Sequence, residues 1–159
     1  MAANIDPIFA LTPNFGVAGV LLTTAMTNTK AFDGTETAGT SMALVYTAGT
    51  NGSRLDRIKV RLTSTAGATA SGTTNATLVR FWFNNGSANT TASNNILFAE
   101  VAIPATTVTA LDTAAQAEYV IDGSVIPTLP ASYKLYAGTT VAAGGTNCAV
   151  GVAAFGGDY

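Results

Sequence analysis

The segment LDRIKVRLT, residues Leu55–Thr63, decides the fold class of this 159-residue chain. From Arg57 on, apolar residues take the even positions and basic residues the odd positions, namely Ile58, Val60 and Leu62 against Arg57, Lys59 and Arg61. Successive side chains of a β-strand point to opposite faces, so a period of two predicts a strand with one buried and one solvated face. The segment follows an Asn51-Gly52 turn signal of the kind that tight hairpins need.

The segment NATLVRFWF, residues Asn75–Phe83, gives the strongest strand signal in the chain. Its two faces carry Val79, Phe81 and Phe83 on one side and Leu78, Arg80 and Trp82 on the other. Because both faces are bulky, we expect this strand to be covered on both sides. Trp82 is therefore expected to be a packed sheet residue rather than a stacking site.

Further strand-like runs follow at short spacings, and Gly, Asn and Pro residues separate them. They are Val17–Thr23, Met42–Thr47, Ile96–Ile103, Glu118–Asp122, Tyr133–Gly138 and Cys148–Phe155. About eight strands of this kind predict an all-β fold, a single antiparallel sandwich or a barrel. We expect an exposed loop over Thr63–Asn75, at most one helical turn over Thr113–Glu118, and a terminal GGDY tail.

The composition excludes several classes of protein. Charged residues make up 10% of the chain, with seven bases, nine acids and a net charge of −2, whereas an average domain has about 25% charged residues. The apolar fraction of 48% argues against disorder. The lone Cys148 has no partner for an intrachain disulfide, and its apolar strand predicts a buried, inert thiol.

No pattern that supports catalysis is found. The chain has no histidine, so neither a Ser-His-Asp triad nor a histidine metal site exists. Phosphate-binding glycine loops and CxxC pairs are missing from the sequence. The segment Asp33–Glu36 lacks most ligand positions of a calcium loop and predicts a turn. We expect no enzymatic activity, no cofactor and no small-molecule substrate.

The first residues carry Asp6 where a secretory signal would carry Lys or Arg. The longest apolar stretch, Phe15–Met26, is shorter than the roughly 20 residues that span a bilayer. We therefore expect no membrane association and folding in a cytosol, in agreement with the unpaired thiol.

Residues 1–15 are predicted to form an extended N-terminal arm before a β-sandwich domain over residues 16–159. No strand is expected before Phe15, because Pro7 and Pro13 interrupt the segment. Its apolar residues Ile5, Ile8 and Phe9 leave two interpretations, a disordered end or an arm that docks on a neighbour.

Four of the seven bases fall within Arg54–Arg61, and three share one strand face. Three readings stay open for this row. It can be a solvated face that resists strand pairing, a contact for an acidic protein partner, or a phosphate contact. Nucleic-acid binding is the least favoured because the whole chain is slightly acidic.

Several segments, taken together, resemble capsid decoration (cement) proteins encoded in tailed-bacteriophage head-gene clusters. They are TPNFG at residues 12–16, VYTAGTNGSRLDRIKVR at 45–61, RFWFNNGSANTTASNNILFAEVAIPATT at 80–107, LPASYKLYAGTTVAAG at 129–144, and the terminal GGDY. The resemblance covers most of the chain and consists of turn and strand patterns.

The resemblance implies a sandwich of jelly-roll type and a homotrimer on the outside of the capsid. Such a protein binds between major capsid subunits and stabilises the shell, and it is made in the cytoplasm of the host bacterium. The candidate capsid contacts are the arm residues Ile5, Ile8, Phe9 and Pro13 and the basic residues Arg57, Lys59 and Arg61. Two alternatives stay open: another virion component, such as a head fibre, tail or adaptor sandwich, and a cellular adhesin or pilin-like module.

Overall fold

The computed structural model describes residues 10–26, 42–65, 70–108 and 118–159. Its elements are β1 (Thr12–Asn14), β2 (Val20–Leu22), β3 (Met42–Thr47), β4 (Ser53–Ser64), β5 (Gly72–Thr73), β6 (Thr77–Asn84), η1 (Ala92–Asn94), β7 (Asn95–Ile103), β8 (Thr107–Val108), β9 (Glu118–Asp122), η2 (Gly123–Val125), β10 (Lys134–Thr139) and β11 (Cys148–Asp158).

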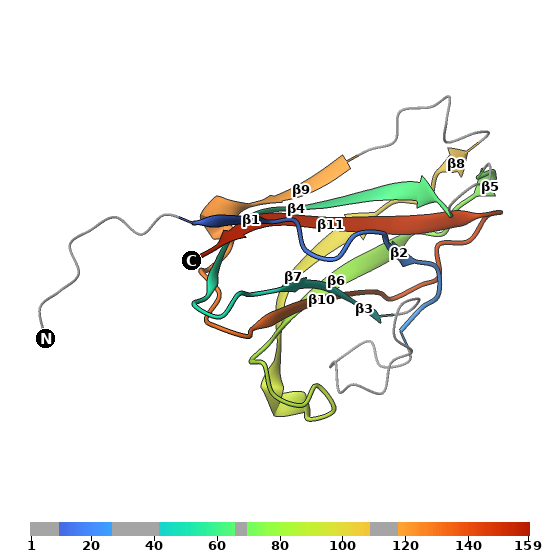
Figure 1. Ribbon diagram of the computed structural model, residues 1–159. Coiled ribbons are helices and arrows are strands. Elements are labelled where there is room, and N and C mark those ends of the chain that lie inside the picture. Colours follow the sequence, from blue (N-terminus) through green and yellow to red (C-terminus); the bar gives the residue numbers. More distant parts are fainter. Residues whose placement is uncertain (1–9, 27–41, 66–69, 109–117) are drawn as a thin grey trace, which may run out of the picture.

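Two antiparallel sheets face each other across one main core (Figure 1). The first, here called the β11 sheet, has the order β1-β11-β4-β9, and β2 also pairs with β11. The second, the β10 sheet, has the order β3-β10-β6-β7, and the short β5 and β8 form a separate pair. The predicted all-β antiparallel sandwich is thus confirmed. The short β1, β2, β5 and β8 bring the described strands to more than the eight expected.

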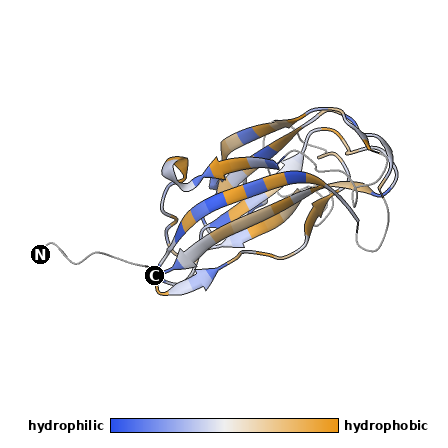
Figure 2. Cartoon of the chain, turned by 90° about the horizontal axis from the view of Figure 1, so that it is seen from above, coloured by the Kyte–Doolittle hydropathy of each residue, from blue (hydrophilic) through white to orange (hydrophobic). Residues whose placement is uncertain are grey.

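The alternation along β4 has the predicted effect. Ile58 and Val60 are fully buried, whereas Arg57 and Arg61 are exposed. Figure 2 shows hydrophilic and hydrophobic residues alternating along the strands. The buried side chains of β4 meet those of β6 and β10 from the other sheet, among them Phe81. Burial of these apolar faces supplies most of the driving force that holds the two sheets together.

The prediction that β6 is covered on both sides is only partly correct. Val79 and Phe81 lie in the main core, and Trp82 on the other face is 1% exposed and packs with Met26 and Met42. Leu78 on that same face is 36% exposed. The described residues therefore cover the Trp82 end of the outer face and leave the Leu78 end open.

Both ends of the chain were misjudged from the sequence. A strand does precede Phe15: β1 pairs with β11, and Pro13 lies opposite Gly157. Proline is tolerated there because β1 lies at a sheet edge, where a missing N–H leaves no gap in a ladder. The GGDY segment is not a tail, since β11 continues through Asp158. The predicted helical turn over Thr113–Glu118 lies outside the described residues except for Glu118, which begins β9.

In its described residues, 63–65 and 70–75, the segment Thr63–Asn75 is not the exposed loop that its small residues predicted. β4 continues to Ser64, and β5 pairs with β8. Ala70 and Thr74 are buried, and the Thr74 hydroxyl donates to the Thr106 carbonyl over 3.2 Å. Small side chains fit here because this segment closes a second apolar cluster with Leu62, Val108, Ala143 and Cys148.

Asp158, at the end of β11, connects four parts of the chain. Its carboxylate accepts hydrogen bonds from the Asn14 amide at 2.9 Å, from the buried Ser53 hydroxyl and from the Tyr46 hydroxyl. Partial burial alone would raise the pKa of Asp158, but the bonds from Ser53 and Asn14 outweigh it and hold the pKa below its ordinary value of 3.8. Burial, with the nearby carboxylate, raises the pKa of Tyr46 to about 12.

We expect Asp158→Asn to lower the free energy of unfolding at pH 7 by about 1–3 kcal/mol, because charge-assisted hydrogen bonds are lost. The folded-state pKa is below the unfolded one, so this contribution is complete above pH 3.8 and is lost as the pH falls further. Urea unfolding of both proteins at pH 7 and pH 3 measures the difference. A difference that stays constant with pH would contradict this account, and Asp56→Asn at an exposed ion pair is the control.

Gly156 lies where the register of β11 shifts against β4. A Cβ at this position would lie 2.2 Å from the Arg54 carbonyl oxygen and 3.0 Å from the Tyr46 hydroxyl. Backbone atoms cannot move aside cheaply, so only glycine fits at this contact.

We expect Gly156→Ala to destabilise the fold by about 1–3 kcal/mol, as overpacking does. Gly151→Ala on the same strand is the matched control. Its Cβ would meet a movable methyl group, Thr63 Cγ2, at 3.0 Å, and we expect the smaller loss. Denaturant melts compare the two variants, and equal losses would show that the close approach to Arg54 is unimportant.

Candidate protein-interaction surface

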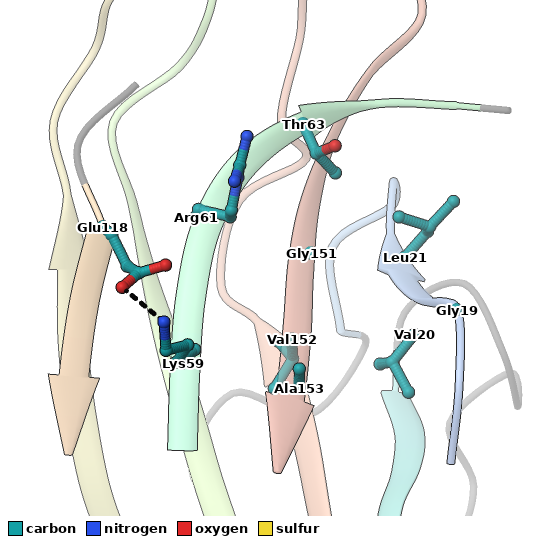
Figure 3. Close-up of a pocket in the computed structure, with 10 residues that line it drawn as sticks. All are labelled: Gly19, Val20, Leu21, Lys59, Arg61, Thr63, Glu118, Gly151, Val152 and Ala153. Atoms are coloured by element: carbon teal, nitrogen blue, oxygen red, sulfur yellow. Dashed lines mark ion pairs between the residues drawn. The ribbon is translucent and has the colours of Figure 1, made fainter. Parts of the chain in front are cut away.

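The predicted basic residues lie together on the outer face of the β11 sheet. Arg57, Lys59 and Arg61 share one face of β4, and we call them the basic row. The neighbouring β11 presents Gly151, Ala153 and Phe155, which are the register partners of Arg61, Lys59 and Arg57 in turn. A row of long cationic side chains therefore runs beside a row that is mostly side-chain-poor (Figure 3).

β9 lies on the other side of the basic row and carries acidic residues. The Lys59 ammonium and the Glu118 carboxylate form an ion pair at 2.9 Å, and Asp122 is the register partner of Arg57. Hydrogen bonds from Ser124 hold the pKa of Asp122 below its ordinary value, and Arg57 adds a smaller effect in the same direction. Within the described ranges, Arg57 and Arg61 have no carboxylate within ion-pair distance, so two of the three charges remain available.

A groove lies over the central glycine of β11. Gly151 pairs with Arg61 of β4 on one side and with Leu21 of β2 on the other. A depression of about 380 Å³ lies over this position; its walls include Lys59, Arg61, Glu118 and Leu21, and its floor is Gly151 and Ala153 (Figure 3). Glycine inside a strand commonly marks a place where a ligand or another backbone comes close.

Aromatic rings limit the groove at one end. Phe155 and Phe15 meet edge to face, with ring centroids 6.2 Å apart, and Phe15 is 68% exposed. A second depression of about 300 Å³ lies beside them, lined by Asp56, Arg57, Lys59 and Phe155. Aromatic and arginine side chains are the residue types most enriched at protein–protein contacts. This face therefore has the composition of an interface centre.

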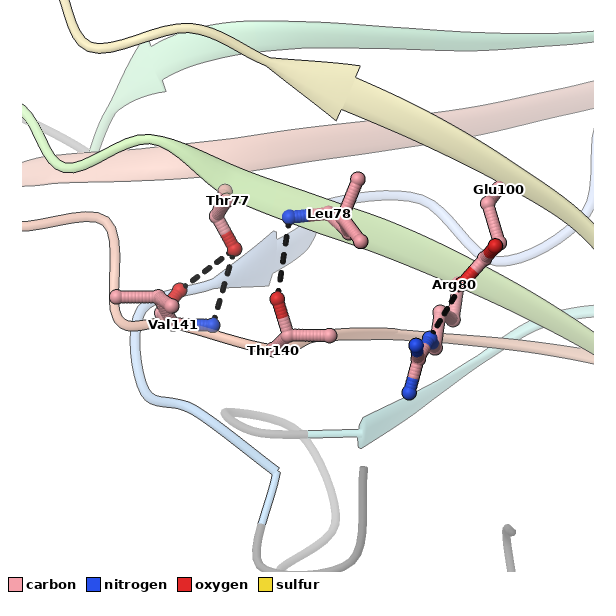
Figure 4. A network of polar contacts seen from close by, with 6 residues as sticks. All are labelled: Thr77, Leu78, Arg80, Glu100, Thr140 and Val141. Atoms are coloured by element: carbon pink, nitrogen blue, oxygen red, sulfur yellow. Dashed lines mark hydrogen bonds and ion pairs between the residues drawn. The ribbon is translucent and has the colours of Figure 1, made fainter. Parts of the chain in front are cut away.

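The outer face of the β10 sheet differs, because its polar groups bind one another. The Arg80 guanidinium and the Glu100 carboxylate form an ion pair at 2.6 Å. The Thr77 hydroxyl donates to the Val141 carbonyl at 2.9 Å, and the Thr140 hydroxyl accepts the Leu78 N–H at 3.2 Å (Figure 4). These contacts extend the pairing of β6 and β10 beyond Thr139, and the ion pair neutralises the Arg80 charge.

The predicted contact residues are only partly brought together. The basic row is contiguous, and Pro13 is exposed on β1, on the other side of β11. Ile5, Ile8 and Phe9 lie outside the described residues. Phe15, Phe155 and Gly151 also belong to this face, although their local sequence did not predict it. A glycine inside the apolar run of β11 was the one sequence feature that pointed to this face. Its place between Arg61 and Leu21 depends on pairing with strands far away in the sequence, which local patterns do not predict.

Cys148 is buried, as predicted, in the second apolar cluster. Burial raises the pKa of its thiol, which disfavours the thiolate. Among the described residues, no group of three or more acidic or cysteine side chains is placed to hold a metal ion. In those same ranges no helix has the length and hydrophobicity needed to cross a membrane.

Comparisons with protein-family models, curated proteins and solved structures found no match to this chain.

If the basic row serves binding, its removal should leave stability unchanged. We expect the double variant Arg57→Gln, Arg61→Gln to unfold within about 0.5 kcal/mol of the parent chain, because exposed charges away from packing contribute little. Chemical denaturation measures this. A loss above about 2 kcal/mol would show that the row supports the fold and would remove the case for a binding role.

Proposed function

We propose that this protein decorates the capsid of a tailed bacteriophage. It binds as a homotrimer to the outer surface of the head, between major capsid subunits, and stabilises the shell. The proposal joins two lines of support: the resemblance of its turn and strand segments to decoration proteins, and an outer sheet face with the chemistry of an interface. The chain is made in the cytoplasm of the host bacterium, and its binding requires neither a cofactor nor nucleic acid.

The observation that carries the proposal is the strand winding, which we assign to the jelly-roll type. If β1 and β2 count as one interrupted strand on β11, the sandwich has eight strands, in chain order β1/β2, β3, β4, β6, β7, β9, β10 and β11. The first pairs with the eighth (β11), the second (β3) with the seventh (β10), the third (β4) with the sixth (β9), and the fourth (β6) with the fifth (β7). This is the winding of a long hairpin rolled into two sheets, and such double-sheet folds recur in viral capsid and lectin domains. Fold alone does not give function, so the surface must support the same role.

The outer face of the β11 sheet supplies this support. Phe15 and Phe155 offer apolar contact, while Arg57 and Arg61 offer cationic groups without intramolecular ion partners among the described residues. Protein interfaces combine such a centre with a polar rim. The arm residues Ile5, Ile8 and Phe9, with Pro13, form the second proposed contact.

Selective binding explains how such a protein would stabilise a head. A protein that binds the expanded lattice and not its precursor stabilises the expanded state by mass action. Three linked copies bind more tightly than one, because the second and third contacts form at high effective concentration. Low charge fits a chain with more than one face to bury.

Heads of the phage that carries this gene, assembled without the protein, provide the test. We expect added protein to co-sediment with expanded heads and to give density on their outer surface by electron microscopy. The double variant Arg57→Glu, Arg61→Glu should weaken binding about tenfold or more, because cationic contacts are reversed. Truncation of residues 1–9, which leaves β1 intact, should also weaken it. Ala102→Lys on the opposite sheet is the control and should bind normally.

Several outcomes would contradict the proposal. Labelled protein found on a tail or fibre would identify another virion component. Absence from purified virions would favour a cellular binding module. A single chain of 16.0 kDa in solution at micromolar concentration would overturn the trimer.

A further inference from the structure

We propose that the groove over Gly151 binds an extended, acidic segment of a protein partner, with one carboxylate held by Arg61. This inference rests on the proposed function only for the partner's identity, which would be the capsid protein. The partner's chemistry follows from the groove itself. It is thus a statement about which kind of chain the β11 sheet recognises.

The dimensions fit an extended chain. Gly151 lies between its register partners Arg61 on β4 and Leu21 on β2. Neighbouring strands are about 4.8 Å apart, so the two walls, measured between the backbones of β4 and β2, stand about 10 Å apart with one strand, β11, between them. The floor consists of Gly151 and Ala153, two residues or about 7 Å apart along β11, and holds a short stretch of extended peptide.

The groove selects for one negative charge between apolar neighbours. Glu118, which lines the groove and is the register partner of Arg61, forms its ion pair with Lys59 at 2.9 Å. Arg61 has no carboxylate within ion-pair distance among the described residues. Arginine offers a planar fork that binds carboxylates in a bidentate manner. The opposite wall, with Val20 and Leu21, and the Ala153 floor are apolar. An occupant that places a carboxylate toward β4 and small apolar side chains on the floor satisfies both walls.

A polyanion fits less well than a single carboxylate. Glu118 and Asp122 lie on β9 directly beside the basic row, and Asp56 lines the adjoining depression. Phosphates spaced along a nucleic acid would meet these carboxylates as well as the arginines. The arrangement therefore favours an acidic peptide over nucleic acid.

The test uses the full chain, labelled with ¹⁵N, and an octapeptide of valine and serine that carries a single central glutamate. We expect saturable amide shifts confined to residues 57–63 of β4, 20–22 of β2 and 151–155 of β11. A twin peptide with lysine in place of glutamate should cause none. Ala153→Leu, which fills the groove, and Arg61→Gln, which removes the charge, should each weaken binding about tenfold. Val120→Leu, on the exposed face of β9 outside the groove, should bind as the parent does.

Thermal melts of the variants separate loss of binding from loss of fold. The inference is overturned if the glutamate peptide causes no shifts, if the lysine twin binds equally, or if Ala153→Leu retains full affinity. Stronger shifts with oligodeoxythymidylate at the same residues would overturn it in favour of nucleic acid. If the protein binds the peptide but does not bind phage heads, the decoration role alone is refuted. Head binding unaffected by Ala153→Leu and Arg61→Gln would refute the groove alone.

Discussion

The pairing of β4 with β11 is the constraint on which the rest of the structure depends. It runs from Ser64 opposite Cys148 to Ser53 opposite Asp158, so the last strand of the chain lies at the centre of a sheet. β9 then adds to one side of the pair, and β1 and β2 add to the other. Because these partner strands are far apart in sequence, the chain must lose much conformational entropy in closing long loops before the sheet can form.

The polar contacts at Asp158 show how this central pair is locked. Hydrogen bonds from Asn14, Ser53 and Tyr46 converge on one carboxylate from β1, β4 and β3. β1 and β4 belong to the β11 sheet and β3 to the β10 sheet, so the carboxylate of Asp158 forms hydrogen bonds with residues of both sheets. The apolar core supplies most of the stabilisation, while the carboxylate fixes which strand ends meet.

Local patterns in the sequence were sufficient for the strands but not for their partners. The alternation in β4 and the turn residues beside it act within a few residues, so they were readable. β1 and the last residues of β11 were missed because Pro13 and the glycine pair are locally unfavourable in strands. They become acceptable only at an edge and at a close contact with Arg54. The basic row was found for the same reason as β4, whereas the groove depends on β2 arriving beside Gly151.

Gly151 and Gly156 lie in different surroundings on the same strand. At Gly151 a Cβ would meet the Thr63 methyl group at 3.0 Å, and no backbone atom lies closer than 3.6 Å, so an alanine there would be less crowded than at Gly156. Gly156, on the same strand, is instead required by the Arg54 carbonyl at 2.2 Å from its would-be Cβ. Of these two glycines, one serves the fold and the other leaves room beside Arg61 and Leu21. Packing accounts for the first, while the second leaves room on the sheet face that the proposed peptide would use.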